Sequence, residues 1–225
     1  LAHGLDIYLK EFPHGCSEQI TSAAFCRLTL ADETDFGLSR AEVSAQLEKA
    51  FAVLRRRQND KGDFGYWTVE TEERIHFMHA YAMHFLIEAK AAGFAPPAEM
   101  FSSGLRYLQT MVALDPTDLD DARAVAYSIY LLTREGVITT NYIINLRDYL
   151  EKNYAKQWQN DMTGVYLAGA LQILRKEDDA AKLITRYRIG EHDLALMNDF
   201  YQPLGADAQY LAVLAREFPE RLKKI

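Results

Sequence analysis

Apolar side chains recur along most of the chain at spacings of three and four residues, which is the period of an amphipathic α-helix. In residues 17–30 the repeating positions are Ile20, Ala23, Ala24 and Leu28. No segment shows a convincing alternation of apolar and polar residues, the pattern typical of a half-buried β-strand. The pattern therefore predicts an all-α protein.

Capping residues and helix breakers divide this pattern into separate helices. Ser39 followed by Glu42 has the form of a capping box and predicts the start of a strong helix. Its expected core face is Val43, Leu47, Ala50, Phe51 and Leu54. Further helices are expected over about residues 1–11, 17–30, 72–92, 97–113, 118–134, 139–153, 163–175, 177–188 and 203–216. Because the intervening loops are short, successive helices are expected to be antiparallel neighbours.

One short motif recurs and suggests how these helices are arranged. Gln58-Asn59-Asp60 returns as Gln159-Asn160-Asp161, and each copy is followed by a glycine and a tyrosine. Helical hairpins repeated around an axis form a ring in which inner and outer helices alternate. The short loops and this recurrence therefore suggest one array of helical hairpins, for which a toroid is one arrangement.

The composition narrows the class of protein. The 225 residues can bury a full core, and we expect one domain over residues 1–225. The net charge of -7 argues against a nucleic-acid partner, since no basic stripe is available to neutralise phosphates. The longest basic cluster, Arg55-Arg56-Arg57, ends a predicted helix, where cations offset the helix dipole.

The chain begins with Leu1 and carries no signal-like or membrane-spanning run, so we interpret it as a piece of a longer protein.

The segment Pro13-His14-Gly15-Cys16-Ser17-Glu18-Gln19 carries the most specific chemistry in the chain. Cys16 and Gln19 stand three residues apart at the start of a helical pattern, so their side chains share one face of a turn. A thiolate placed there can attack the carboxamide, expel ammonia and leave an internal thioester. Backbone N–H groups and the dipole at a helix N-terminus favour the thiolate. Gly15 is expected to permit a sharp turn and close approach.

Two ionisable neighbours and a second cysteine complete the candidate chemistry. His14 and Glu18 flank the reactive pair and are candidates for moving protons during ammonia loss or acyl transfer. The alternative is that His14 is a solvated turn residue and Glu18 a carboxylate stabilised by the helix dipole. Cys26 lies ten positions after Cys16, a rise of about 15 Å along one helix, which is too far for a disulfide. We therefore expect Cys26 to be an inert core residue.

The motif Pro13-x-Gly15-Cys16-x-Glu18-Gln19 resembles the thioester motif of the alpha-2-macroglobulin and complement family. The segment Gln58–Trp67 is similar to a loop of these thioester domains, and His79–Leu86 resembles the helix that follows it. Residues 207–221 resemble the bacterial branch in particular. The resemblance covers most of the chain, and its specific part is the thioester motif.

The resemblance implies a fold and a function. The fold is the α/α toroid, carried within a much larger protein that traps proteases. After a protease cleaves a bait region elsewhere in that protein, the thioester acylates an amine or hydroxyl of the attacker. The expected partners are therefore target proteases and other domains of the parent chain, and the protein is a single-use inhibitor rather than a turnover enzyme. Bacterial relatives imply a periplasmic location, an inner-membrane lipid anchor and a role in envelope defence.

Two departures from the family pattern modify these expectations. The family domain is usually longer, so the toroid is expected to be incomplete at its C-terminal end. Some complement relatives use a downstream histidine to direct transfer towards hydroxyls, but no histidine lies between His84 and His192. We therefore expect amine acylation. No cofactor or metal is expected.

Three other interpretations stay open from the sequence. Glu72, His76 and His79 share one helical face and could hold zinc, although buried hydrogen-bonded histidines are far more common. Asp118-Leu119-Asp120-Asp121 resembles the acid motif of class II terpene cyclases, which are also α/α barrels, but here it follows Pro116 at the start of a helix. The third is a non-catalytic helical scaffold with a degenerate thioester motif.

Overall fold

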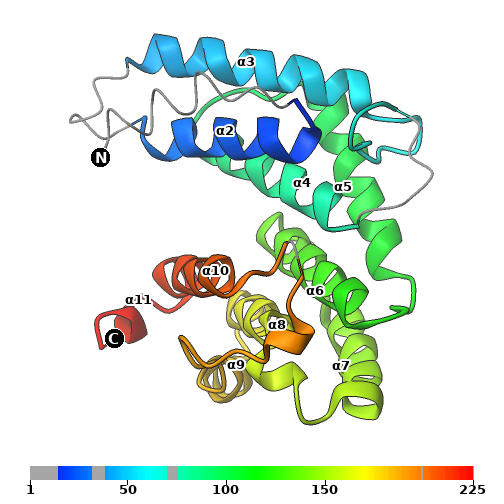
Figure 1. The fold of residues 1–225 in the computed structure, drawn as a ribbon, viewed down its shortest axis with the longest axis vertical. Helices are drawn as coiled ribbons and strands as arrows, with labels where there is room; N and C mark the ends of the chain where they lie inside the picture. Colours follow the sequence, from blue (N-terminus) through cyan, green and yellow to red (C-terminus); the bar gives the residue numbers. More distant parts are fainter. Residues whose placement is uncertain (1–14, 32–38, 70–75, 199, 225) are drawn as a thin grey trace. The chain divides into compact units, whose positions relative to one another are not determined.

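The computed structural model describes residues 15–31, 39–69, 76–198 and 200–224. Within these ranges the protein is helical, with one isolated β-bridge between Gln58 and Phe64 and no β-strand. The α-helices are α2 Ser17–Thr29, α3 Arg40–Arg57, α4 His76–Ala91, α5 Ala98–Val112, α6 Leu119–Arg134, α7 Thr140–Tyr154, α8 Met162–Ile173, α9 Glu177–Ile184, α10 Pro203–Glu217 and α11 Pro219–Leu222 (Figure 1). Two short 3-10 helices, η2 Trp158–Asn160 and η3 Leu194–Leu196, lie in the connections. The prediction of an all-α protein is confirmed.

The chain divides into two compact units, Leu1–Tyr107 and Leu108–Ile225. In the first unit, α2 packs against both α3 and α4 (Figure 1). The predicted core face of α3, from Val43 to Leu54, is buried at all five positions. Its predicted capping box is also present, since Ser39 Oγ accepts from the Glu42 amide at 3.2 Å and Glu42 Oε2 accepts from the Ser39 amide at 2.9 Å. The helix expected over residues 1–11 lies outside the described residues.

Helix α4 is buried around most of its circumference, as expected of a helix that fills the centre of a unit. His79 of this helix is fully buried, and its Nε2 lies 3.1 Å from the Gly104 carbonyl oxygen. Its Nδ1 lies 3.3 Å from Asp63, and its ring contacts Tyr107 edge to face at 4.6 Å. His79 is therefore a hydrogen-bonded core histidine, the more common of the two alternatives considered from the sequence.

The loop after α3 is built from side-chain hydrogen bonds to its own backbone. Gln58 ends α3 and donates from Nε2 to the carbonyl oxygens of Gly62 and Met100, at 3.0 and 2.9 Å. Asn59 Oδ1 accepts from the amides of Lys61 and Asp63, both at 3.0 Å. These bonds fix a tight reversal, so that the next residues of the loop run back towards α2 (Figure 1).

In the second unit, α8 is the central helix and packs against α6, α9 and α10. It is apolar on all sides, and its residues from Met162 to Leu171 are buried. Asp161 caps its N-terminus by accepting from the Thr163 amide at 3.0 Å. The same carboxylate accepts three further bonds from the buried Arg123 guanidinium, two from Nε and one from Nη2. A buried ion pair of this kind requires both partners, because either one alone would leave an uncompensated charge.

One helix boundary in this unit differs clearly from the sequence-based expectation. The helix predicted over 177–188 ends at Ile184. Tyr187 sits at the next apolar position of the pattern, but it lies beyond the end of the helix and stacks on Tyr210 at 4.6 Å. The predicted helix was therefore too long, because a tyrosine buried by this stacking falls at the spacing expected of a further helical turn.

Candidate functional site

Cys16 is the N-cap residue of α2, and Gln19 is the third residue of that helix. Cys16 Sγ accepts from the backbone N–H of Gln19 at 3.4 Å, and the side-chain oxygen Gln19 Oε1 accepts from the backbone N–H of Cys16 at 3.3 Å. This is a capping box in which a cysteine takes the place usually held by serine or threonine. Each side chain folds back onto the backbone of the other residue, so sulfur and carboxamide lie within one turn. Cys16 is only 1% exposed.

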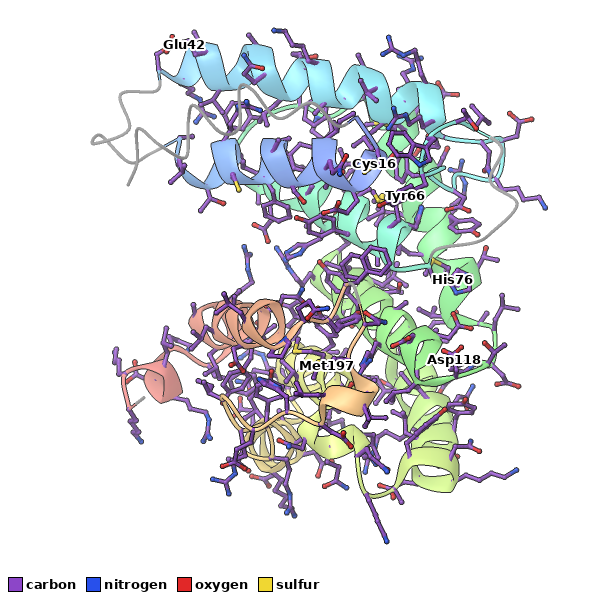
Figure 2. All side chains as sticks on the ribbon, in the orientation of Figure 1. Cys16, Glu42, Tyr66, His76, Asp118 and Met197 are labelled. Atoms are coloured by element: carbon purple, nitrogen blue, oxygen red, sulfur yellow. The ribbon has the colours of Figure 1, made fainter. Side chains whose placement is uncertain are left out.

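The loop after α3 holds the first residue of α2. The Ser17 amide donates to the Tyr66 carbonyl oxygen at 2.8 Å, and Ser17 Oγ donates to the Gly65 carbonyl oxygen at 2.7 Å. Figure 2 shows Tyr66 beside Cys16 at the N-terminal end of α2. Ser17 is fully buried, so these bonds are shielded from water. They fix the position of the turn that carries the reactive pair.

Gly65 is the position in this loop where the backbone packs too closely for a residue with a Cβ. A Cβ at Gly65 would overlap the Thr68 carbonyl group, with the carbonyl carbon 2.9 Å away. By contrast, a Cβ at Gly15 would meet no described atom within 4 Å. Within the described residues the close approach that requires glycine is at Gly65; the segment before Gly15 lies outside them, so the expectation for Gly15 stays a prediction.

Arg57 joins three segments around the site. Its Nη2 donates to the Gly15 carbonyl oxygen at 2.6 Å, and its Nη1 reaches Ser17 Oγ at 3.1 Å and the Tyr66 carbonyl oxygen at 3.4 Å. Partial burial lowers the pKa of the Arg57 guanidinium, and the nearby Cys16 sulfur acts in the opposite direction. Arg57 therefore clamps the residue before Cys16 to the end of α3 and brings a positive charge near the sulfur.

We expect Arg57→Met to loosen the start of α2. The substitution leaves the Gly15 carbonyl oxygen without this charged donor, a loss of about 1–2 kcal/mol. Hydrogen–deuterium exchange of the α2 amides should then be roughly tenfold faster. The matched control is Arg56→Met, which removes an exposed neighbour and should leave this exchange unchanged. Equal effects of the two substitutions would contradict the role given to Arg57.

Glu18 lies beside the sulfur and is held by a hydroxyl. Its Oε2 is 4.0 Å from Cys16 Sγ, and its Oε1 accepts from Ser22 Oγ at 2.8 Å. The structure thus brings three of the four predicted site residues, Cys16, Glu18 and Gln19, into one turn. The fourth, His14, lies outside the described residues. Sequence analysis did not identify Ser22, because a serine one turn into a helix carries no distinctive pattern.

Cys26, near the other end of α2, is placed differently from Cys16. It is half-buried rather than fully buried, and it forms no disulfide with Cys16. Burial raises the pKa of the Cys26 thiol, against a smaller opposing effect of Arg27. A protonated thiol is a poor nucleophile, so Cys26 is expected to be unreactive. The prediction that it is a core residue is wrong, because the side chain is only half-buried.

The acidic motif that resembles terpene cyclases has structural roles. Asp118 caps α6 by accepting from the Asp121 amide at 2.8 Å, and Asp121 accepts from the Thr117 hydroxyl at 2.9 Å. Asp120 pairs with Arg123 Nη1 at 2.7 Å. The three carboxylates therefore begin a helix and neutralise a buried cation, which argues against an acid catalyst at this place.

The described part of the chain shows neither a metal-binding cluster nor a membrane-spanning helix. In that part, no group of three or more His, Cys, Asp or Glu side chains is arranged to hold a metal ion. Glu72, one of the three residues considered for zinc, lies outside the described residues. No described helix combines the length and the hydropathy needed to cross a bilayer.

Comparison with known proteins identifies relatives over the full chain, although no family model matches it. The chain is 37% identical over 224 residues to an alpha-2-macroglobulin of Rickettsia conorii, covering 98% of this chain and 12% of that protein. It is 32% identical over 231 residues to an alpha-2-macroglobulin homolog of Yersinia pestis, covering 100% of this chain and 12% of that protein. The chain therefore spans about an eighth of the length of these relatives.

Solved structures share the fold at lower identity. The chain matches native Escherichia coli alpha-2-macroglobulin, solved from domain MG7 to the C-terminus, with a TM-score of 0.77 at 21% identity over 99% of this chain and 37% of that chain. It matches Salmonella alpha-2-macroglobulin reacted with methylamine with a TM-score of 0.75 at 22% identity, over 93% of this chain and 14% of that one. The predicted fold class, an α/α toroid of helical hairpins, is thereby confirmed.

Proposed function

The chain belongs to the bacterial branch of the alpha-2-macroglobulin family, and from this premise we propose that it is the thioester domain of a longer protease-trapping protein. In this proposal Cys16 and Gln19 are the reactive pair. The observation that carries it is the reciprocal capping box, in which Cys16 Sγ lies 3.4 Å from the backbone nitrogen of Gln19 and Gln19 Oε1 lies 3.3 Å from the backbone nitrogen of Cys16. A cysteine in this position brings the nucleophile and the carboxamide together before any reaction occurs.

The proposed bond forms by loss of one ammonia. The Cys16 thiol gives up its proton, and the sulfur attacks the side-chain carbonyl carbon of Gln19. The bond from that carbon to nitrogen breaks, and the nitrogen leaves as ammonia after taking the proton. The Arg57 guanidinium and the N-terminal end of α2 place positive charge near the sulfur from which the proton leaves.

The stored acyl group is released by an amine. The nitrogen of a lysine attacks the same carbon, the carbon–sulfur bond breaks, and the amine proton passes to sulfur. The products are a Cys16 thiol and an amide bond between the lysine and residue 19, so the reaction happens once. Support comes from a related Salmonella protein solved after reaction with methylamine, and from related Escherichia coli proteins activated by trypsin and by porcine elastase.

Burial supports the storage of such a bond. Cys16 is 1% exposed within the described residues, and an acyl–sulfur bond is preserved only where water is excluded. We propose that other domains of the parent polypeptide complete this cover and carry the bait sequence that proteases cleave. The periplasmic location and the inner-membrane lipid anchor stay predictions.

Covalent capture of a protease tests this function. Trypsin added to the full-length polypeptide that contains this chain should give an adduct that survives boiling in detergent. Pretreatment with methylamine should abolish the adduct, because the amine consumes the thioester first. Absence of the adduct, or an adduct that methylamine does not affect, would contradict the proposed trap.

A further inference from the structure

Two hydroxyl groups and the Glu18 carboxylate form a line that leads to the reactive sulfur. Tyr81 Oη of α4 lies 3.1 Å from Ser22 Oγ, which lies 2.8 Å from Glu18 Oε1. The other carboxylate oxygen, Oε2, lies 4.0 Å from Cys16 Sγ. This Tyr81–Ser22–Glu18 line joins two helices of the same compact unit and ends at the atom where the proposed chemistry takes place.

The direction of the hydrogen bonds in this line follows from elementary chemistry. An ionised carboxylate can only accept, so the Ser22 hydroxyl donates its single proton to Glu18. Ser22 Oγ can then only accept from Tyr81, which must donate. Burial raises the pKa of the Tyr81 phenol; the Ser22 hydrogen bond lowers it by less, and the Glu18 charge raises it slightly, so the phenol keeps its proton. Both donors therefore point towards Glu18.

This arrangement orients the carboxylate. With Oε1 accepting from Ser22, Oε2 lies on the side of Cys16 and is the oxygen placed to exchange a proton with it. Tyr81 is in turn held by its ring, which stacks between Phe77 at 5.5 Å and Phe25 at 5.9 Å. The two hydrogen bonds of this line are partly buried, and in such a place each bond polarises and strengthens the next.

We propose that Ser22 and Tyr81 are positioning residues that hold Glu18 as the proton carrier between Cys16 and the nitrogen that enters or leaves at Gln19. The proposal rests on the thioester function and goes beyond it by assigning a path for the proton. During bond formation, Glu18 Oε2 takes the thiol proton and gives it to the departing nitrogen, which leaves as ammonia. During acylation, Oε2 takes the proton of the attacking amine and returns it to the Cys16 sulfur. The carboxylate is regenerated in both directions.

The test uses the full-length polypeptide and the rate at which methylamine releases the Cys16 thiol. We expect Ser22→Ala and Tyr81→Phe each to slow this release by about tenfold, since correctly placed proton transfer contributes to the rate. The Phe variant keeps the aromatic stack and removes only the hydroxyl. The matched control is Thr21→Val, which removes a buried hydroxyl of α2 that makes no hydrogen bond to the described part of the chain. It should release thiol at the wild-type rate.

Two further variants separate positioning from a general structural role. Ser22→Thr retains the hydroxyl and should react like wild type. The double variant Ser22→Ala with Tyr81→Phe should react at about the rate of Ser22→Ala alone, because Tyr81 acts only through Ser22; independent structural effects would multiply instead. A folded Ser22→Ala variant that forms no thioester, while Thr21→Val forms it normally, also supports the proposal, because formation uses the same proton path.

The possible results separate failure of the positioning role of Ser22 and Tyr81 from failure of the thioester function. Wild-type release rates in Ser22→Ala and Tyr81→Phe, a loss in Thr21→Val equal to theirs, or failure of Ser22→Thr to restore the rate would each overturn the positioning role. In those cases the thioester function stands. A wild-type polypeptide that does not react with methylamine would remove the function itself.

Discussion

The Cys16→Ala variant of the full-length polypeptide is expected to lose all thioester chemistry. Without the sulfur there is no nucleophile for the Gln19 carboxamide, so the intact mass should show no loss of ammonia. Methylamine should add nothing at residue 19, and trypsin should give no covalent adduct. Because Cys16 also caps α2 through Sγ, a modest loss of helix stability of about 1 kcal/mol should accompany the chemical loss.

The second cysteine supplies a matched control within the same helix. Cys26→Ala removes a half-buried thiol near the other end of α2 and leaves the capping box intact. This variant should keep the ammonia loss, the methylamine reaction and the protease adduct. If Cys26→Ala abolished them and Cys16→Ala did not, the assignment of the nucleophile would be wrong.

Gly65→Ala is expected to produce the largest structural effect near the site. The new Cβ would overlap the Thr68 carbonyl group, which is backbone and cannot rotate away. The loop must therefore shift, and with it the two carbonyl oxygens that bind Ser17. Overpacking together with the loss of buried hydrogen bonds should cost about 3 kcal/mol.

Hydrogen–deuterium exchange of the full-length polypeptide measures this cost where it arises. The α2 amides should exchange roughly a hundredfold faster in Gly65→Ala, and the fraction of molecules carrying the thioester should fall. Gly205→Ala in α10 is the control, because a Cβ there meets nothing within 4 Å and alanine favours a helix. Unchanged α2 exchange in Gly65→Ala would show that the loop does not hold the reactive turn.

Features set by nearby residues could be predicted from the sequence. The capping box of Ser39 and Glu42 and the buried stripe of α3 depend on contacts within a few residues, and both are confirmed. The placement of Cys16 and Gln19 in one turn is also local, since it follows from their spacing at the start of α2. The wrong end of the helix at 177–188 shows the limit of periodicity, because Tyr187 is buried by packing on Tyr210 rather than by a helical turn.

Contacts between residues far apart in the chain could not be predicted from the sequence. Ser17 binds Gly65 across 48 residues, and periodicity contains no information about that contact. The partly buried contacts of Arg57, by contrast, could have been inferred from its position in the helical pattern. Arg57 continues the stripe of Ala50 and Leu54 at helical spacing, so a charged residue stands on a buried face, where it needs a specific partner. The requirement for glycine at Gly65 was likewise not predicted, because it depends on the conformation of the loop.

The central claim is an acyl bond between the side chains of residues 16 and 19, and intact-protein mass spectrometry of the full-length polypeptide tests it most directly. The mass before treatment should be lower than the sequence mass by one ammonia. After methylamine the mass should rise by one methylamine, with the modification at residue 19 and a free thiol at Cys16. A full sequence mass in the freshly purified, folded polypeptide, unchanged by methylamine, would contradict the claim.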